Sequence, residues 1–118
     1  MTLKIYEWEI KEYGEFEKIK LCKFEQNKIL RKLSRHFKII TPCLAQSYRR
    51  GGAGSYEYNS NIIRTGVNST LGDICHEFAH HLTSQQHNKR MGHCKYWKKN
   101  LKKVYTFAKR YLPKKDLK

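Results

Sequence analysis

Two histidines four residues apart, with a glutamate directly after the first, are the strongest chemical signal in the sequence. His76, Glu77 and His80 form the pattern HExxH. On a helix, residues i and i+4 project from the same side, so both imidazoles can bind one metal ion. Glu77 is offset by about 100 degrees, which places its carboxylate where it can accept a proton from a metal-bound water. The pattern predicts a hydrolase with one zinc ion and Glu77 as general base.

A catalytic zinc ion needs a third protein ligand and an open fourth position. The sequence has no glutamate after Glu77, which excludes zincins with a downstream glutamate ligand. Thr83 and Gln86 stand where a metzincin has its glycine and third histidine. The remaining candidates for the third ligand are His81, His87, His93 and Cys94.

His93 is the favoured third ligand because an amphipathic segment that follows it can anchor it on the core. A ligand on an anchored element is held more rigidly than a ligand on a free loop. His81 faces about 100 degrees away from His80 on a helix, and His87 lies in the polar stretch SQQHNK. His87 and Cys94 stay open, either in place of His93 or in addition to it.

The HExxH segment must lie on a helix with one buried face. Thr70 and Asp73 fit an N-terminal capping box, which predicts a helix over residues 70–84. Its apolar residues recur at helical spacing: Leu71, Ile74, Cys75, Phe78 and Leu82.

The segments before this helix predict a basic helix and a small sheet. Apolar residues at roughly helical spacing predict one amphipathic basic helix over residues 16–37, preceded by a short strand or a helical approach at 3–10. Strand-like segments at 43–48 and 55–65 flank a glycine-rich stretch, which predicts a β-hairpin in an antiparallel or mixed sheet. Residues 59–67 are the expected edge strand, where an extended peptide could bind by strand addition.

A last helix is predicted over residues 94–112, followed by a basic tail at about 113–118. Its anchoring residues are Trp97, Leu101, Val104, Tyr105 and Ala108. With 118 residues, the chain has room for a single domain, and the order of elements predicts an α+β fold of minimal zincin-like type.

Positive charge dominates the chain, with 25 Lys and Arg against 10 Asp and Glu and a formal net charge of +15. Residues 88–118 contain twelve of the basic residues and a single acid. Such a surface attracts polyanions, so DNA or another polyanion is the expected partner besides a protein or peptide substrate. The candidate nucleic-acid contacts are Arg49, Arg50, Lys95, Lys98, Lys99 and Lys102.

Composition also restricts the compartment. No stretch approaches the roughly 20 apolar residues that cross a bilayer, and the first residues lack the features of a signal peptide. The four cysteines form no CxxC pair, which argues against a disulfide framework or a zinc ribbon. We expect a cytoplasmic protein without membrane contact, associated with the nucleoid if it binds DNA.

The segments HEFAHH at 76–81 and GHCKYW at 92–97 resemble the SprT-like zinc metallopeptidases. The family pattern is HExxH, a loop, and a GHG-like histidine followed by an aromatic residue. The resemblance covers about residues 20–110 and includes the glycine-rich hairpin before the HExxH helix, in a compact form without the family's C-terminal zinc ribbon. It implies that His76, His80 and His93 bind zinc and that Glu77 is the general base. It also implies action on DNA-associated proteins.

Two other functions remain open at the level of sequence. The chain could be a non-catalytic basic module that binds nucleic acid around a structural zinc site, which His87 or Cys94 would complete as a fourth ligand. It could also be a peptidase whose positive charge serves an acidic protein substrate.

Overall fold

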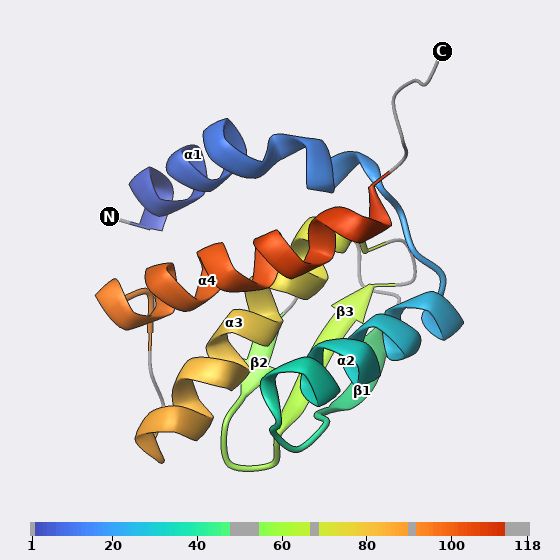
Figure 1. The fold of residues 1–118 in the computed structure, drawn as a ribbon, viewed down its shortest axis with the longest axis vertical. Coiled ribbons are helices and arrows are strands. Elements are labelled where there is room, and N and C mark those ends of the chain that lie inside the picture. The colour runs from blue at the N-terminus through green and yellow to red at the C-terminus, as the bar shows by residue number, and fades with distance from the viewer. Residues whose placement is uncertain (1, 48–54, 67–68, 90–91, 113–118) are drawn as a thin grey trace.

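The computed structural model describes residues 2–47, 55–66, 69–89 and 92–112, and in this part of the chain the fold is α+β (Figure 1). Its helices are α1 (Thr2–Tyr13), the 3-10 helix η1 (Gly14–Lys18), α2 (Lys23–Phe37), α3 (Leu71–His87), α4 (Lys95–Ala108) and the 3-10 helix η2 (Lys109–Tyr111). Its strands are β1 (Cys43–Ser47), β2 (Ser55–Glu57) and β3 (Ile62–Gly66).

Figure 1 shows α1 running beside α4 at one end of the molecule, with the sheet toward the opposite end. Helix α3 lies between α4 and the sheet, and it packs against α2, α4, β2 and β3. The HExxH residues therefore lie on the most central helix of the fold.

The core confirms the two apolar stripes expected from the sequence. Every predicted stripe residue of α3 is buried: Leu71, Ile74, Cys75, Phe78 and Leu82. The predicted anchors of α4 are buried as well: Trp97, Leu101, Val104, Tyr105 and Ala108. None of the described helices is long and apolar enough to cross a membrane.

The sheet is mixed, in the order β1-β3-β2. Strand β1 pairs in parallel with β3, and β2 pairs with β3 in antiparallel fashion. The predicted hairpin between 43–48 and 55–65 is therefore wrong, because β3 separates β1 from β2 within the described sheet.

The hairpin instead lies inside the second segment, between β2 and β3. Asn61 adopts a left-handed conformation with φ of 53° and donates its backbone N–H to the carbonyl oxygen of Tyr58 at 3.2 Å. Asparagine tolerates this conformation, so the chain can reverse here without glycine. The predicted edge strand at 59–67 is also wrong, since β3 is the central strand and β1 and β2 form the edges.

The predicted single helix over residues 16–37 is divided in two. Between η1 and α2 the chain is extended and runs beside the segment that precedes α3: Leu21 donates its N–H to Ser69 O at 3.0 Å, and Leu71 donates to Ile19 O at 2.7 Å. These backbone hydrogen bonds replace the helical ones, and Cys22 is exposed instead of lying on a buried stripe. Before them, the segment at 3–10 is helical, as part of α1.

Candidate metal centre

The start of α3 is fixed by a reciprocal cap, as the sequence predicts. The Thr70 hydroxyl accepts the backbone N–H of Asp73 at 3.1 Å, and the Asp73 carboxylate accepts the backbone N–H of Thr70 at 3.1 Å. The helix continues beyond the expected end at residue 84 to His87 and ends at Asn88, which has a φ of 54°. This cap sets the helical phase of His76, Glu77 and His80.

The structure brings His76, His80 and His93 together. One ring nitrogen of each lies within 4.8 Å of those of the other two, and the Nε2 atoms of His76 and His93 are 3.1 Å apart. Two nitrogen ligands of a tetrahedral zinc ion lie about 3.3 Å apart, given Zn–N bonds of about 2.0–2.1 Å. Among the described residues, this is the one group of three or more His, Cys, Asp or Glu side chains that is compact enough to hold a single ion.

Helix α4 holds the third histidine in place. His93 lies in the bend that precedes Lys95, the first residue of α4. Trp97, on the first turn, is fully buried, and its ring centroid lies 4.6 Å from that of His93 and 4.9 Å from that of His76. The Trp97 indole also donates to the backbone carbonyl of His76 at 3.4 Å. One rigid aromatic side chain therefore fixes the positions of two candidate ligands.

Glu77 lies beside the cluster with only 6% of its surface exposed. Burial raises the pKa of Glu77 to about 7, although the neighbouring His76 opposes the shift. A carboxylate with a pKa near neutrality can both accept and return a proton at physiological pH, which is what a general base in hydrolysis must do. The position and environment of Glu77 suit that role.

The electrostatics of the histidines differ. Burial alone would lower the pKa of His76, but a hydrogen bond to Glu9 and the negative charges of Glu9 and Glu77 outweigh it and raise this pKa. The pKa of His93 is lowered by burial and by the nearby His76.

Glu9 contacts the candidate site, and sequence analysis did not connect it with the histidines. Its Oε1 atom lies 2.7 Å from Nδ1 of His76, and its Oε2 accepts the hydroxyl of Tyr105 at 2.6 Å. Glu9 is 67 positions away from His76 in the chain, so no local spacing could connect them. The stretch LKIYEWEI contains Glu7 as well as Glu9, and nothing in its local pattern distinguishes the two or names a partner.

The other candidate ligands point elsewhere. His81 is fully buried, its Nε2–H donates to the carbonyl oxygen of Ile40 at 2.7 Å, and its Nδ1 lies 2.9 Å from the hydroxyl of Tyr56. His87 donates through Nδ1 to the carbonyl oxygen of Thr83 at 3.1 Å. Neither these residues nor Cys94 belongs to the histidine group found among the described residues.

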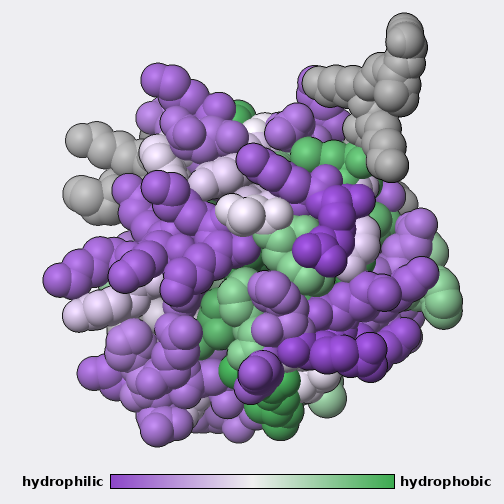
Figure 2. Space-filling model, in the orientation of Figure 1, coloured by the Kyte–Doolittle hydropathy of each residue, from purple (hydrophilic) through white to green (hydrophobic). Residues whose placement is uncertain are grey.

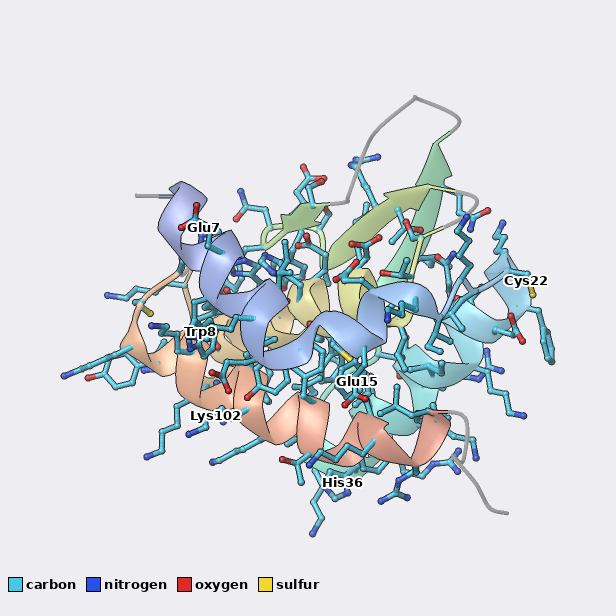
Figure 3. The ribbon with its side chains drawn as sticks, turned by 90° about the horizontal axis from the view of Figure 1, so that it is seen from above. Glu7, Trp8, Glu15, Cys22, His36 and Lys102 are labelled. Carbon is cyan, nitrogen blue, oxygen red and sulfur yellow. The ribbon has the colours of Figure 1, made fainter. Side chains whose placement is uncertain are left out.

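The predicted nucleic-acid contacts are spread over different environments. Lys98 places its Nζ 4.5 Å from the ring centroid of Trp8 on α1, and Trp8 is labelled in Figure 3. Lys95 contacts the ring of Tyr96, while Lys99 and Lys102 are exposed. Arg49 and Arg50 lie outside the described residues.

A groove of about 410 Å³ between α2 and α4 gathers further positive charge. Its apolar floor includes Phe37 and the largely buried Phe107, and Figure 2 shows a hydrophobic area there bordered by hydrophilic side chains. The polar side chains that line it are His36, Lys102, Lys103, Thr106 and Arg110, and no acid is among them. His36 and Lys102 are labelled on this side of the molecule in Figure 3.

The three candidate metal ligands thus lie on α3 and directly before α4, and the basic groove is lined by residues of α2, α4 and η2. Comparison of the chain with protein-family models, curated proteins and solved structures finds no match, so the evidence for function lies in these residues themselves.

Proposed function

We propose that the chain is a zincin-like zinc metallopeptidase of the SprT-like type. The observation that carries this proposal is the convergence of His76, His80 and His93, within 4.8 Å of one another, beside the buried Glu77. Three imidazoles suit zinc better than magnesium or calcium, which prefer oxygen ligands.

His76, His80 and His93 would hold the ion, each through one ring nitrogen. When bound, zinc supplies Lewis acidity toward the scissile carbonyl and lowers the pKa of a water molecule toward neutrality. Glu77 accepts the proton of the attacking water and later passes a proton to the leaving amine. Trp97, which is fully buried, packs against the rings of all three histidines on the inner side of the cluster.

The group of three ligands favours an enzyme over a structural zinc site. A structural site is closed by four protein ligands, whereas a catalytic one keeps a position for water or substrate. His87 and Cys94 are described by the structure and stand outside the group. The rival function, a binding module built around a structural zinc, would need one of them to rearrange.

DNA-associated proteins are the proposed substrates. The groove between α2 and α4 combines two lysines and an arginine with an aromatic floor and without an acidic residue in its lining. Phosphates attract these cations, so the phosphate backbone of DNA is the ligand of matching chemistry. A peptidase tethered there would encounter proteins that are bound to the same strand.

Cleavage of an unstructured basic protein, with and without single-stranded DNA, tests the proposal. We expect the zinc-loaded chain to cut, and Glu77→Gln to bind one zinc ion equally while cutting at least about 100-fold more slowly. Glu12→Gln, which alters an exposed carboxylate of α1, is the matched control and should cut as the parent does. Stimulation by DNA would support the proposed substrates.

Absence of cutting by the parent chain with one zinc bound and DNA tightly bound would favour the binding module. Cutting by Glu77→Gln at the parent rate would remove Glu77 from the mechanism.

A further inference from the structure

We propose that Glu9 is a positioning residue of the metal centre, and that through it the docking of α1 and the occupancy of the metal site stabilise each other. The inference rests on the proposed metal site. It concerns a residue of the N-terminal helix that neither the HExxH pattern nor the SprT-like resemblance includes.

Both oxygens of the Glu9 carboxylate have a partner inside the fold. Oε1 lies 2.7 Å from Nδ1 of His76, and Oε2 accepts the Tyr105 hydroxyl at 2.6 Å. Glu9 is 6% exposed and Tyr105 fully buried. A buried carboxylate is costly unless its oxygens are hydrogen-bonded, and these two contacts provide that compensation.

The contact with Nδ1 determines whether the other ring nitrogen of His76, Nε2, can bind a metal ion. A carboxylate accepts hydrogen bonds, so Nδ1 carries the proton that Glu9 accepts. In the neutral ring, Nε2 then presents its lone pair, and this atom lies in the histidine cluster, 3.1 Å from Nε2 of His93. A carboxylate on the remote nitrogen of a ligating histidine fixes its tautomer and orientation and makes it a stronger ligand.

Tyr105 holds the carboxylate itself in position. It lies on α4, the helix that follows His93, and its ring stacks on Tyr13 of α1 with centroids 4.0 Å apart. The chain Tyr105–Glu9–His76 therefore connects α4, α1 and α3, the three helices that surround the cluster.

This arrangement has a thermodynamic consequence for α1. Glu9 is supplied by a helix that carries none of the candidate ligands, so α1 must be docked for His76 to be held in its metal-binding form. By linkage, if docked α1 strengthens metal binding by a given factor, bound metal stabilises docking by the same factor. Metal loss would then loosen α1 from the rest of the fold.

Zinc affinity at one fixed pH, measured by competition with a chromophoric chelator, tests the positioning role. We expect Glu9→Ala to bind zinc about 10- to 100-fold more weakly than the parent, as removal of such partners does elsewhere. Glu9→Gln keeps the shape and one acceptor oxygen but removes the charge, so its affinity should fall between the two. Glu12→Gln makes the same charge change at an exposed site on α1 and should bind as the parent does.

A second measurement separates positioning from a merely structural role. Hydrogen exchange of the α1 amides should slow on zinc addition in the parent and in Glu12→Gln, and should change much less in Glu9→Gln. If Glu9→Ala does not fold, Glu9→Gln and Tyr105→Phe, which removes the donor to Oε2, carry the same comparison. Tyr105→Phe should weaken zinc binding by less than Glu9→Ala does, because the contact to Nδ1 remains.

Two failures can be told apart. Equal zinc affinity in the parent, Glu9→Gln and Tyr105→Phe, with exchange from α1 independent of zinc, would overturn the role of Glu9 while leaving the metal site intact. Zinc binding by His76→Ala at the parent affinity would instead overturn the metal site, and the inference about Glu9 with it.

Discussion

At the scale of single residues, His80 and His81 show that neighbouring positions on one helix have opposite roles. His80 belongs to the cluster of three histidines, whereas His81 is fully buried and connects α3 to Ile40 and Tyr56. We expect His81→Ala to lower the free energy of unfolding by about 2–4 kcal/mol, because it removes a fully buried ring together with its contacts to the Ile40 carbonyl and the Tyr56 hydroxyl. Its zinc stoichiometry should stay at one. Denaturant unfolding and metal analysis of the purified variant measure both.

The matched variant is His80→Ala, with the reverse result: zinc is lost while the metal-free protein unfolds close to the parent midpoint. Zinc loss in His81→Ala without loss of stability would show that the two roles are exchanged.

The cysteines allow a second prediction at this scale. Burial raises the pKa of the Cys75 thiol well above its usual value, whereas Cys22 and Cys43 are exposed. A thiolate is the reactive form, so Cys75 is protected both by its pKa and by the surrounding core. In native protein at pH 8, we expect iodoacetamide to modify Cys22 and Cys43 and to leave Cys75 unmodified until the chain is unfolded. Peptide mass mapping over time measures this, and modification of Cys75 at the rate of Cys22 would contradict the buried position.

At the scale of elements, the start of α3 determines where the site residues point. The Thr70 hydroxyl caps the helix and also donates to the Glu17 carboxylate at 2.8 Å. Thr70→Ala removes both bonds, so we expect a loss of about 1–2 kcal/mol in the free energy of unfolding, measured by denaturant titration. Thr70→Ser keeps the hydroxyl and should recover most of it.

Thr106→Ala is the control for the Thr70 prediction, because Thr106 is exposed within α4 and caps nothing. It should leave stability within about 0.5 kcal/mol of the parent. Equal effects of the two alanine variants would mean that the cap is not what holds the start of α3.

Elements with a strong local signal could be predicted from the sequence. Helix α3 has a cap and an apolar stripe, and α4 has five regularly spaced core residues, so local pattern and tertiary packing agree. The region at 16–37 has equally regular spacing, yet its first part follows backbone hydrogen bonds to Ser69 and Leu71. Such pairing depends on a segment about 50 positions away and leaves no local trace.

The sequence predicts which segments form strands of the sheet, but not which strands pair with each other. Two β-rich segments around a glycine-rich stretch suggest adjacent strands, whereas the turn that forms the hairpin is at Asn61. Strand order depends on how α2 and α3 cover the sheet, which no turn motif encodes.

The candidate site also has residues that the sequence predicts and one that only the tertiary fold reveals. The positions of His76 and His80 follow from helical spacing, and His93 follows from the anchoring of α4 by Trp97. Glu9 reaches His76 through the docking of α1, which contacts α4 where Tyr105 donates to Glu9 and stacks on Tyr13, and this docking is a property of the tertiary fold. Sequence motifs thus identify the candidate ligands, and packing identifies the side chain that contacts one of them.

At the scale of the whole molecule, charge is unevenly distributed. Among residues 78–112 there is no acid at all, while five of the ten acids lie within the first 17 residues. One of those five, Glu9, is buried and pairs with His76 in the histidine cluster. Five of the seven residues that line the α2/α4 groove come from this stretch without acids.

We expect the groove to be a main contact for single-stranded DNA. Replacing Lys102, Lys103 and Arg110 together with glutamine should weaken binding of an oligonucleotide, measured by fluorescence anisotropy at several salt concentrations. If each residue contacts one phosphate, the plot of log K against log salt should become less steep by about 2, since each single-strand contact contributes about 0.7. Phe107 and Phe37 remain in this variant, so the loss reports on charge alone.

The control must remove the same charge from another surface, because a formal charge of +15 attracts DNA from every direction. Lys18, Lys20 and Lys23 are exposed around the start of α2 and do not line the groove. Their replacement by glutamine changes the net charge equally and should leave the salt slope nearly as steep as in the parent. If both triple variants lose slope equally, DNA is attracted by the overall field. If neither variant loses slope, the positive charge serves another partner, and an acidic protein becomes the favoured substrate.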